Sequence, residues 1–515
     1  MEQWVLTLMI FIPILGMLVI LALPSRAHNL IRYTALAFTI PPLLLAIWLF
    51  GAFDRASSGM QFVVKVPWIP SFNIDYFVGI DGVSVSMVLL TALLCFLCIP
   101  ASFGIEKAVK GYFALFLLLD AGMMGVFCAL DFFLFYIFWE VMLLPMYFLI
   151  GIWGGPRREY AAIKFFLYTL FGSVLMLIAM LALYFYNEPH TFDMTKLMAQ
   201  AGTYSSEPVA LWPFSLWGWG FQHIVWMALF IGFAIKIPAF PFHTWLPDAH
   251  VEAPTAISVI LAGVLLKMGT YGILRVCYPM LPVATADLAF VFLAALGTWN
   301  IVYGAFCAMA QKDLKKLVAY SSISHMGYVM LGMAAFTPQG INGAVLQMFN
   351  HGTITAMLFL LVGVIYDRAH HRQIEGFGGL ADVMPVYTGI TAVAFFAALG
   401  LPGLSAFISE VLVLLGSWRP YPRLTVAAAS AVVLTAGYML WTMQRMYLGE
   451  VNEKYLTLPD VTPREVFTLA PLGVIVVVLG VYPHAVLDLL NVSLVNLNDV
   501  VMAAADTVRV AAQAP

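Results

Sequence analysis

Long apolar runs divide this chain into segments that are each long enough to cross a membrane. A membrane-spanning helix needs about 20 mostly apolar residues, and runs of that length recur from Trp4 to Leu489 with short polar connections. The pattern predicts an all-α polytopic membrane protein with about 14 transmembrane helices. The expected spans lie near residues 4–23, 30–50, 81–103, 112–130, 132–153, 162–186, 222–240, 253–277, 284–309, 314–335, 341–366, 386–416, 424–447 and 465–489.

Two of the expected spans are interrupted by proline and glycine. The seventh reads FAIKIPAFPFHTWLPDAH with Pro238 and Pro241, and the twelfth reads FFAALGLPGLSAFISEVL with Gly400, Pro402 and Gly403. Proline removes a backbone donor, and a broken helix at membrane depth needs protein or water to satisfy the freed groups. A single proline kink is common in membrane helices, but two interrupted helices in corresponding positions are typical of inverted repeats and a transport path.

Composition agrees with a membrane protein and places its two sides. Hydrophobic residues make up 63% of the chain and charged residues only 10%, whereas soluble domains are about a quarter charged. The net charge of -3 includes no block of like charges, so we expect no nucleic-acid partner. In alternate loops, one side carries fifteen Lys and Arg residues, including Lys315, and the other carries seven, including Arg275.

The basic-rich side is expected to face the cytoplasm of a bacterial cytoplasmic (inner) membrane. An even number of spans then puts both termini outside, together with the largest loops, near residues 51–80 and 187–221. Because no long soluble insertion separates the spans, residues 1–515 are expected to form one membrane domain. The apolar run at the N-terminus lacks a basic leader, so we expect it to be a retained first helix.

Six ionisable residues fall at mid-membrane depth. Glu140 is about eight residues into its span, which at 1.5 Å per residue places it roughly 12 Å deep. A charge at the centre of a bilayer costs about 2.5 to 3.5 kcal/mol on insertion scales, so structure alone explains six such groups poorly. The candidate proton-carrying residues are Glu140, Lys236, Lys267, His325, His351 and Glu410.

Each candidate also has a structural interpretation. A lone buried histidine is more often a packing residue than a proton carrier. Glu140 and Lys236 could form a static ion pair that joins two helices, although desolvation makes such pairs weak stabilisers. Lys267 has no obvious fixed partner in the sequence, which favours a group that titrates. Asp120 is a weaker candidate, and so is Asp131, which lies near a helix end.

Glu, His and Lys can all exchange protons when burial and neighbouring charges shift them toward neutral pH. At about 8 Å and an effective dielectric constant of about 20, two unit charges interact by about 2 kcal/mol. Making or breaking one pair can therefore change the protonation of the next group, and such a chain can act as a gated relay. An external energy source is still required over a full cycle.

We find no motif in the chain that supplies this energy. The sequence contains no P-loop and no dinucleotide-binding glycine motif. Cys95 and Cys98 form a single CxxC without a second pair, so we interpret them as packing residues rather than a metal or redox site. His370 and His371 lie in a charged loop and are expected to be solvated. Redox chemistry or ATP hydrolysis must occur in a partner.

Three long motifs resemble a known family. They are WEVMLLPMYFLIGIWGG around Glu140, IKIPAFPFHTWLPDAHVEAPTAISVILAGVLLKMGTYG around Lys236 and Lys267, and QKDLKKLVAYSSISHMGYV around His325. They are similar to the antiporter-like subunits shared by respiratory complex I, multisubunit sodium/proton antiporters and membrane-bound hydrogenases. An acidic residue at Glu410, where L-type and N-type subunits generally carry lysine, resembles the M-type subunits of complex I. The resemblance covers most of spans four to thirteen.

The resemblance implies roles for the candidate residues. Glu140 and Lys236 would form the input-side pair, Lys267 would bridge with help from His325 and His351, and Glu410 would be the terminal group. It also implies two inverted five-helix repeats, with three leading helices before them and one helix and a tail after them. These parts would cover residues 1–111, 112–277 (helices 4–8), 284–447 (helices 9–13), 465–489 and 490–515.

The resemblance further implies that the chain is a proton-translocating subunit of an NADH:quinone oxidoreductase. FMN, iron-sulfur clusters and quinone would then be held by partner subunits, with none in this chain. Expected partners are the L-type and N-type chains and other membrane subunits, together with the lipid bilayer. Two alternatives remain open: a subunit of a cation/proton antiporter or hydrogenase, and a structural scaffold whose buried charges are replaceable.

Overall fold

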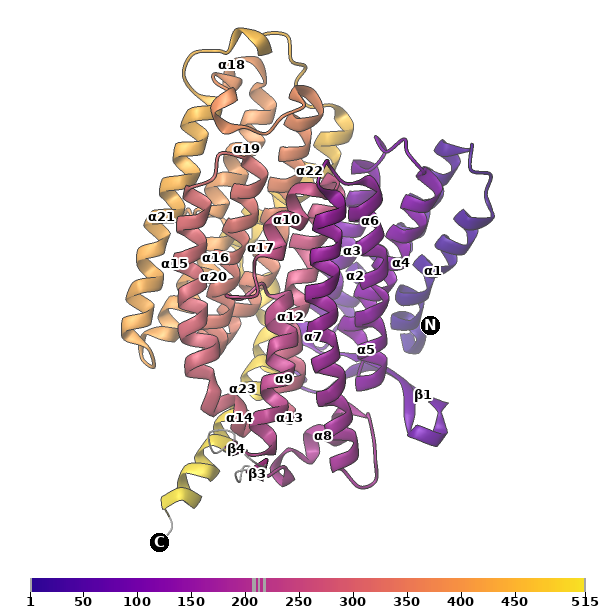
Figure 1. The fold of residues 1–515 in the computed structure, drawn as a ribbon, viewed down its shortest axis with the longest axis vertical. Helices are drawn as coiled ribbons and strands as arrows, with labels where there is room; N and C mark the ends of the chain where they lie inside the picture. Colours follow the sequence, from indigo (N-terminus) through magenta and orange to yellow (C-terminus); the bar gives the residue numbers. More distant parts are fainter. Residues whose placement is uncertain (1, 206–209, 212–213, 216–218, 514–515) are drawn as a thin grey trace.

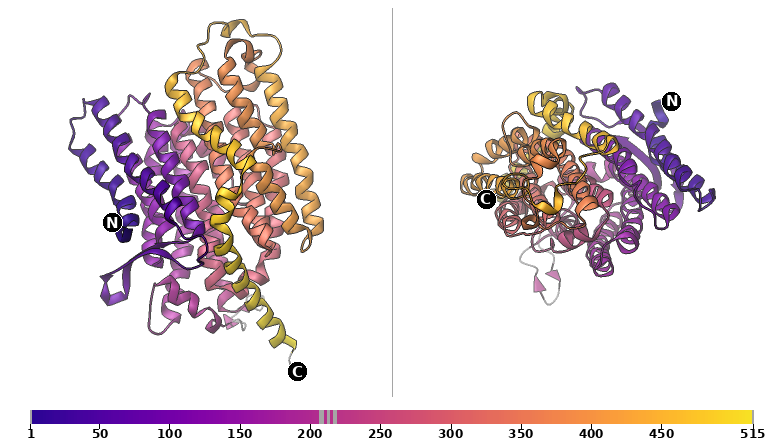
Figure 2. Two further views of the ribbon diagram at one scale, coloured as in Figure 1. Left: turned by 180° about the vertical axis from the view of Figure 1, so that it is seen from behind. Right: turned by 90° about the horizontal axis from the view of Figure 1, so that it is seen from above.

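Helices make up most of the computed structural model, which describes residues 2–205, 210–211, 214–215 and 219–513. Within these residues, twelve helices are long and apolar enough to cross a membrane. Ten of them cross singly, whereas α22 and α23 follow one slanted path along the bundle (Figure 2). One less apolar helix, α16, and two interrupted helices supply the other crossings. The all-α membrane fold with about 14 crossings is thereby confirmed.

The leading part of the chain forms the flank of the bundle that carries the N-terminus (Figure 1). A β-hairpin lies between its second and third helices, inside the loop expected near residues 51–80. The elements are α1 (Val5–Ala22), α2 (His28–Ala52), β1 (Gln61–Ile69), β2 (Ile74–Ile80) and α3 (Gly82–Ala101).

The next group of elements contains the first interrupted helices. Two π-helical segments, Leu261–Leu265 and Ile273–Cys277, join α11, α12 and α13 into one span. Nine residues of the loop expected near residues 187–221 lie outside the described part of the chain. The elements are α4 (Val109–Cys128), α5 (Phe132–Val141), α6 (Leu143–Trp153), α7 (Arg158–Tyr186), α8 (Met194–Ala199), β3 (Ala210–Leu211), β4 (Phe214–Ser215), α9 (Phe221–Lys236), α10 (Trp245–Glu252), α11 (Thr255–Ile260), α12 (Leu266–Gly272) and α13 (Tyr278–Met280).

The rest of the chain forms the opposite side of the bundle. Another π-helical segment, Phe290–Ala295, joins α14 to α15. The elements are α14 (Pro282–Ala289), α15 (Leu296–Met309), α16 (Leu314–Ala334), α17 (Pro338–Ala369), α18 (Leu380–Val383), α19 (Pro385–Ala398), α20 (Ser405–Trp418), α21 (Pro422–Tyr447), α22 (Pro463–Val481) and α23 (His484–Gln513).

The two ends of the bundle differ. One end, here called the hairpin end, carries β1, β2 and α8, and the C-terminus lies beyond it. The other, the α18 end, carries the connections from α1 to α2, from α17 to α19 and from α21 to α22. These α18-end connections belong to the basic-rich set. The orientation with the α18 end in the cytoplasm and both termini outside stays a prediction.

Two spans differ from the sequence prediction. The fifth was expected to be continuous, but α5 ends at Val141 and α6 begins at Leu143. Pro145 explains this break, because a proline ring clashes with the carbonyl four residues earlier. The last span was expected to end at residue 489 and to be followed by a tail. Instead the helix breaks before Pro483 and continues as α23 to Gln513, and residues 514–515 of the tail lie outside the described part.

Candidate functional site

Lys236 lies in an aromatic pocket at the interruption of the seventh span. It is the last residue of α9 and is 1% exposed. Its Nζ lies 5.3 Å from the ring centroid of Trp139 and 5.5 Å from that of Phe165. Aromatic rings attract a cation, and the C-terminal end of a helix stabilises positive charge. The pocket therefore holds an ammonium ion without giving it a hydrogen-bond partner among the described residues.

Glu140 shares this region but does not contact Lys236. It is the penultimate residue of α5, and its Oε1 is buried without a hydrogen-bond partner among the described residues. Among those residues, Lys236 is in no ion pair within 4.0 Å, although the charge of Glu140 acts on it. The direct ion pair considered from the sequence is therefore not formed. We call Glu140, Lys236, Trp139 and Phe165 the Lys236 site.

Protein groups satisfy the backbone at the interruption between α9 and α10. The amide of Phe240 donates to Oδ1 of Asn300 at 2.9 Å. The indole of Trp245 donates to the carbonyl of Ile235 at 2.9 Å, one residue before Lys236. Exposed backbone groups at membrane depth are tolerated only with such partners. The break is therefore anchored to α15 on one side and held close to Lys236 on the other.

Lys267 lies directly beside His351. Its side chain is fully buried, and Nζ donates to the carbonyl of Ala262 at 2.5 Å and lies 2.6 Å from Nδ1 of His351. The π-helical segment Leu261–Leu265 immediately precedes α12, and such segments occur frequently at functional sites. The lysine, which had no obvious partner in the sequence, is thus hydrogen-bonded to a histidine of α17.

His351, His325 and Glu410 continue the line from Lys267. The rings of His325 and His351 have centroids 5.7 Å apart, and a cavity of about 10 Å³ lies between their helices. That volume corresponds to about one water molecule. Nδ1 of His325 lies 3.1 Å from Oε1 of Glu410. We call the four residues in this order the Lys267–Glu410 line; all four are buried.

Three polar residues that sequence reasoning missed support the Glu410 end. Gln347 lies 3.5 Å from Glu410 through Nε2, and its Oε1 accepts a hydrogen bond of 2.5 Å from Ser409. Asn350 donates to Ser409 Oγ at 3.1 Å. A sequence signal existed, because Gln347, His351 and Thr355 recur every four residues and so lie on one face of α17.

Glycine permits the close approach of Glu410 to the interruption between α19 and α20. Gly400 and Gly403 have φ of 79° and 93°, a left-handed region that side chains other than glycine rarely adopt. A Cβ added at Gly400 would lie 3.0 Å from Oε2 of Glu410. Both glycines therefore turn the chain, and Gly400 also makes room for the carboxylate.

His250 and Lys315 form a further buried pair of titratable residues that sequence reasoning did not select. His250 on α10 is fully buried, stacks on Phe359, and feels the charges of Lys315 and Lys267. Lys315 was expected in a loop, but it is 4% exposed on α16 and donates to the carbonyl of Ala253 at 2.6 Å. Tertiary packing around the first turn of α16 buries it.

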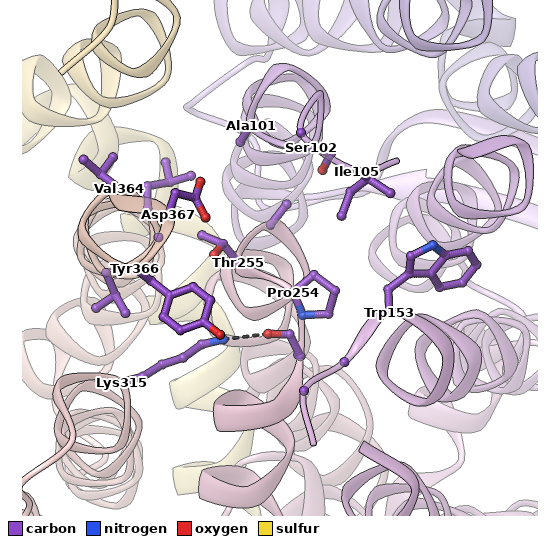
Figure 3. Close-up of a pocket in the computed structure, with 18 of the residues that line it drawn as sticks. Ala101, Ser102, Ile105, Trp153, Pro254, Thr255, Lys315, Val364, Tyr366 and Asp367 are labelled. Carbon is purple, nitrogen blue, oxygen red and sulfur yellow. Dashed lines mark hydrogen bonds between the residues drawn. The ribbon is translucent and has the colours of Figure 1, made fainter. Parts of the chain in front are cut away.

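A cavity of about 540 Å³ reaches Lys315 from the α18 end (Figure 3). Its lining includes Ser102 directly after α3, Trp153 of α6 and Asp367 of α17, so it lies between the two sides of the bundle. Polar and charged side chains on its wall make it suited to water. It gives the buried residues around His250 a polar approach from the α18 end.

The weaker candidates have structural surroundings. Asp131 caps α5, accepting hydrogen bonds from the amides of Leu134 at 3.0 Å and Asp75 at 3.2 Å. Asp120 is buried beside Cys95. Among the described residues, His, Cys, Asp and Glu form no group of three or more suited to a metal ion.

Comparisons with known proteins agree with this architecture. Residues 129–435 match the family model described as NADH:quinone oxidoreductase/Mrp antiporter, transmembrane. The chain is 46% identical to NADH-quinone oxidoreductase subunit M of Rhodobacter capsulatus, over 96% of both chains. It is 40% identical to NADH-ubiquinone oxidoreductase chain 4 of Chondrus crispus, over 95% of this chain and 96% of the relative.

A solved structure extends the likeness to three dimensions. A chain of respiratory complex I from Thermus thermophilus with bound NADH superposes with a TM-score of 0.84 and 29% identity, covering 97% of this chain and 100% of that one. Sequence and fold thus agree over nearly the whole length. The chain belongs to the NADH:quinone oxidoreductase/Mrp antiporter family of membrane subunits, and within it is similar to the subunit M and chain 4 members of complex I.

Proposed function

We propose that this chain moves protons across the membrane through Glu140, Lys236, Lys267, His351, His325 and Glu410. The observation that carries the proposal is the Lys267–Glu410 line, in which a lysine, two histidines and a carboxylate follow one another at membrane depth. The Lys267–His351 separation is 2.6 Å and the His325–Glu410 separation is 3.1 Å. These are hydrogen-bond distances, over which a proton can pass directly. A water between the two histidines would complete the path.

The Lys236 site would act as a switch that controls proton release, rather than as a chain of hydrogen bonds that carries the proton. Among the described residues, Lys236 has no hydrogen-bond partner to hold its proton, and Glu140 acts on it through its charge. Two unit charges about 8 Å apart at an effective dielectric constant of about 20 interact by about 2 kcal/mol, which is the scale of effect that such a charge can exert. A change in the distance between Glu140 and Lys236 would therefore change the readiness of Lys236 to release its proton. His250, on which the charges of Lys315 and Lys267 act, is suited to pass the proton on.

The energy would come from NADH:quinone electron transfer in partner subunits. The curated relatives are named as subunits of that enzyme. The single CxxC of this chain has no second pair to hold an iron-sulfur cluster. We therefore place FMN, iron-sulfur clusters and quinone in the partner subunits. L-type and N-type antiporter-like chains are the proposed neighbours. We place the complex in the bacterial inner membrane, with the α18 end in the cytoplasm.

Glu140→Gln tests the relay. NADH-driven proton uptake and NADH oxidation are measured on vesicles that contain equal amounts of assembled complex, with Glu159→Gln, an exposed residue of α7, as the control. Proton uptake is expected to fall about tenfold or more, because a glutamine has no charge to act on Lys236 and cannot exchange a proton. Unchanged uptake would overturn the relay and favour a scaffold. Purification without flavin- and iron-sulfur-containing subunits would favour a cation/proton antiporter instead.

A further inference from the structure

A second cavity, of about 340 Å³, lies at the hairpin end beside a buried ion pair that the relay does not use. Its walls come from the loop before β1, the first turn of α3, α8, the Thr255–Met280 span and α23. Arg275 and Asp81 line it, with side chains only 7% and 11% exposed. Arg275 was expected in a loop from the sequence. An ion pair this deeply buried requires a structural or functional explanation.

Arg275 is fixed by contacts to three polar side chains. Its NH2 group lies 2.6 Å from Oδ1 of Asp81 and donates to Ser84 Oγ at 3.0 Å. Its Nε donates to the hydroxyl of Tyr271 at 3.1 Å, and the guanidinium lies over the Tyr271 ring. Asp81 is itself fixed, because it accepts a hydrogen bond from the amide of Ser84 and so caps α3. The cluster thus joins α3 to the Thr255–Met280 span.

A proton path through these hydrogen bonds would end at Arg275. A proton passes along a chain only where each member accepts one proton and releases another. The guanidinium has donors but no acceptor, and it does not deprotonate in proteins. Tyr271 donates its own proton to the carbonyl of Phe127, and Ser84 lies 3.0 Å from the Tyr271 hydroxyl. The hydroxyls next to Arg275 therefore lead to the carbonyl of Phe127 and to the carboxylate of Asp81, which is itself paired with the guanidinium, and neither contact leads on toward Lys267.

The cluster lies between this cavity and the relay. Arg275 follows Lys267 by eight residues on one span, which is about 12 Å at 1.5 Å per residue. The side chain of Lys267 runs toward Ala262, away from Arg275. Tyr271 occupies the intervening turn. A proton leaving Lys267 for the hairpin end would have to pass both Tyr271 and a guanidinium that can neither accept nor release it.

We propose that Arg275, held by Asp81, Tyr271 and Ser84, is an insulating plug between the hairpin-end cavity and Lys267. The plug prevents protons on Lys267 from leaking to the hairpin side, so that they leave along the Lys267–Glu410 line instead. The inference rests on the proposed function, because it assumes that Lys267 carries protons. It assigns to Arg275 a role in coupling that requires no proton transfer by Arg275 itself.

Passive proton flux tests the plug. The whole complex is reconstituted into liposomes without NADH, a potassium gradient with valinomycin sets the voltage, and a pH dye reports proton entry. The variant D81N/R275Q removes both charges together, so no unpaired charge stays buried, and asparagine preserves the cap of α3. Its flux is expected to rise about threefold or more above that of the wild type.

R423Q is the matched control, because it removes an exposed arginine from the first turn of α21. Its flux is expected to equal that of the wild type. A wild-type flux in an assembled D81N/R275Q complex would overturn the plug.

R275K keeps the test decisive if the double variant does not assemble. Lysine can release its proton in alkaline medium, whereas a guanidinium cannot. Asp81 and Tyr271 face this position in both proteins, so their titration contributes equally. The flux of R275K is expected to match the wild type at pH 7 and to exceed it at about pH 10. Equal flux at both pH values would overturn the plug.

Adding K267M to D81N/R275Q separates the plug from the relay. If protons leak through Lys267, the added change is expected to return the flux to the wild-type value. A leak that persists would show that the cavity leads elsewhere, and the insulating role would be wrong. Failure of the relay itself has a different signature, which is normal NADH-driven pumping in K267M alone.

Discussion

The Lys236 site and the Lys267–Glu410 line solve the same problem in different ways. Each places charged groups beside an interrupted helix at membrane depth. Lys236 ends the half-helix α9 among aromatic rings and has no hydrogen-bond partner in the described part of the chain. Glu410 instead lies in the second turn of α20 and contacts His325 and Gln347. An isolated charge responds to distant charges, while a bonded one passes its proton to a neighbour. The contrast indicates that the Lys236 site acts as a switch, after which the Lys267–Glu410 line, here called the wire, carries the proton from residue to residue.

Lys236→Arg should produce the largest effect on this comparison. Arginine keeps the positive charge beside Trp139 and Phe165 but stays protonated. If Lys236 must release its proton, NADH-driven pumping is expected to fall about tenfold or more at equal amounts of assembled complex. Lys454→Arg, at an exposed position, is the control. Full pumping by the arginine variant would make Lys236 an electrostatic anchor only.

Glu410→Gln tests the wire at its end. An amide preserves the size and polarity that His325 and Gln347 contact, so assembly should be unaffected. Pumping is expected to fall about fivefold, because the last group can no longer hold a proton. Vesicles carrying Glu375→Gln, an exposed residue, provide the comparison. Wild-type pumping in the Glu410 variant would remove the carboxylate from the path.

Gln347→Leu should give the smallest effect. The substitution removes a donor 3.5 Å from Glu410 and the acceptor for Ser409, and buried groups left unpaired cost about 1 to 3 kcal/mol each. Pumping is expected to fall about twofold, with a lower thermal midpoint for the purified complex. Gln373→Leu on the surface should change neither. A tenfold loss of pumping would instead make Gln347 a member of the wire.

Depth and periodicity in the sequence predicted the helices of this molecule better than its polar contacts. The apolar runs were sufficient for the fourteen crossings and for the interruptions at Pro238 and Gly400. The break at Pro145 was missed, although its clash with the carbonyl of residue 141 is a local effect. The helical tail after Pro483 was missed as well, although apolar residues recur at helical spacing in it. The buried residues Val486, Leu490, Leu494 and Val501 lie on one face of α23, which packs against α3, α14 and α17.

Side-chain pairing depends on which helices become neighbours. Arg275 and Lys315 were assigned to loops from their positions near span ends, yet both are buried by packing from distant segments. Asp81, the partner of Arg275, is 194 residues away in the sequence. The six candidate residues could be selected by depth, but their contacts could not. Only the fold shows that four of them follow one another in the Lys267–Glu410 line. Glu140 and Lys236 belong to the separate Lys236 site.

Lys267 provides the most direct test, because it begins the Lys267–Glu410 line and its charge also acts on His250. Protons taken up per NADH oxidised are measured in liposomes containing the purified complex with Lys267→Met, beside Lys196→Met at an exposed position of α8. The proposed relay predicts that proton uptake falls about tenfold for Lys267→Met, with assembly intact and the control unchanged. Wild-type proton uptake and wild-type NADH oxidation in the assembled Lys267→Met complex would contradict it.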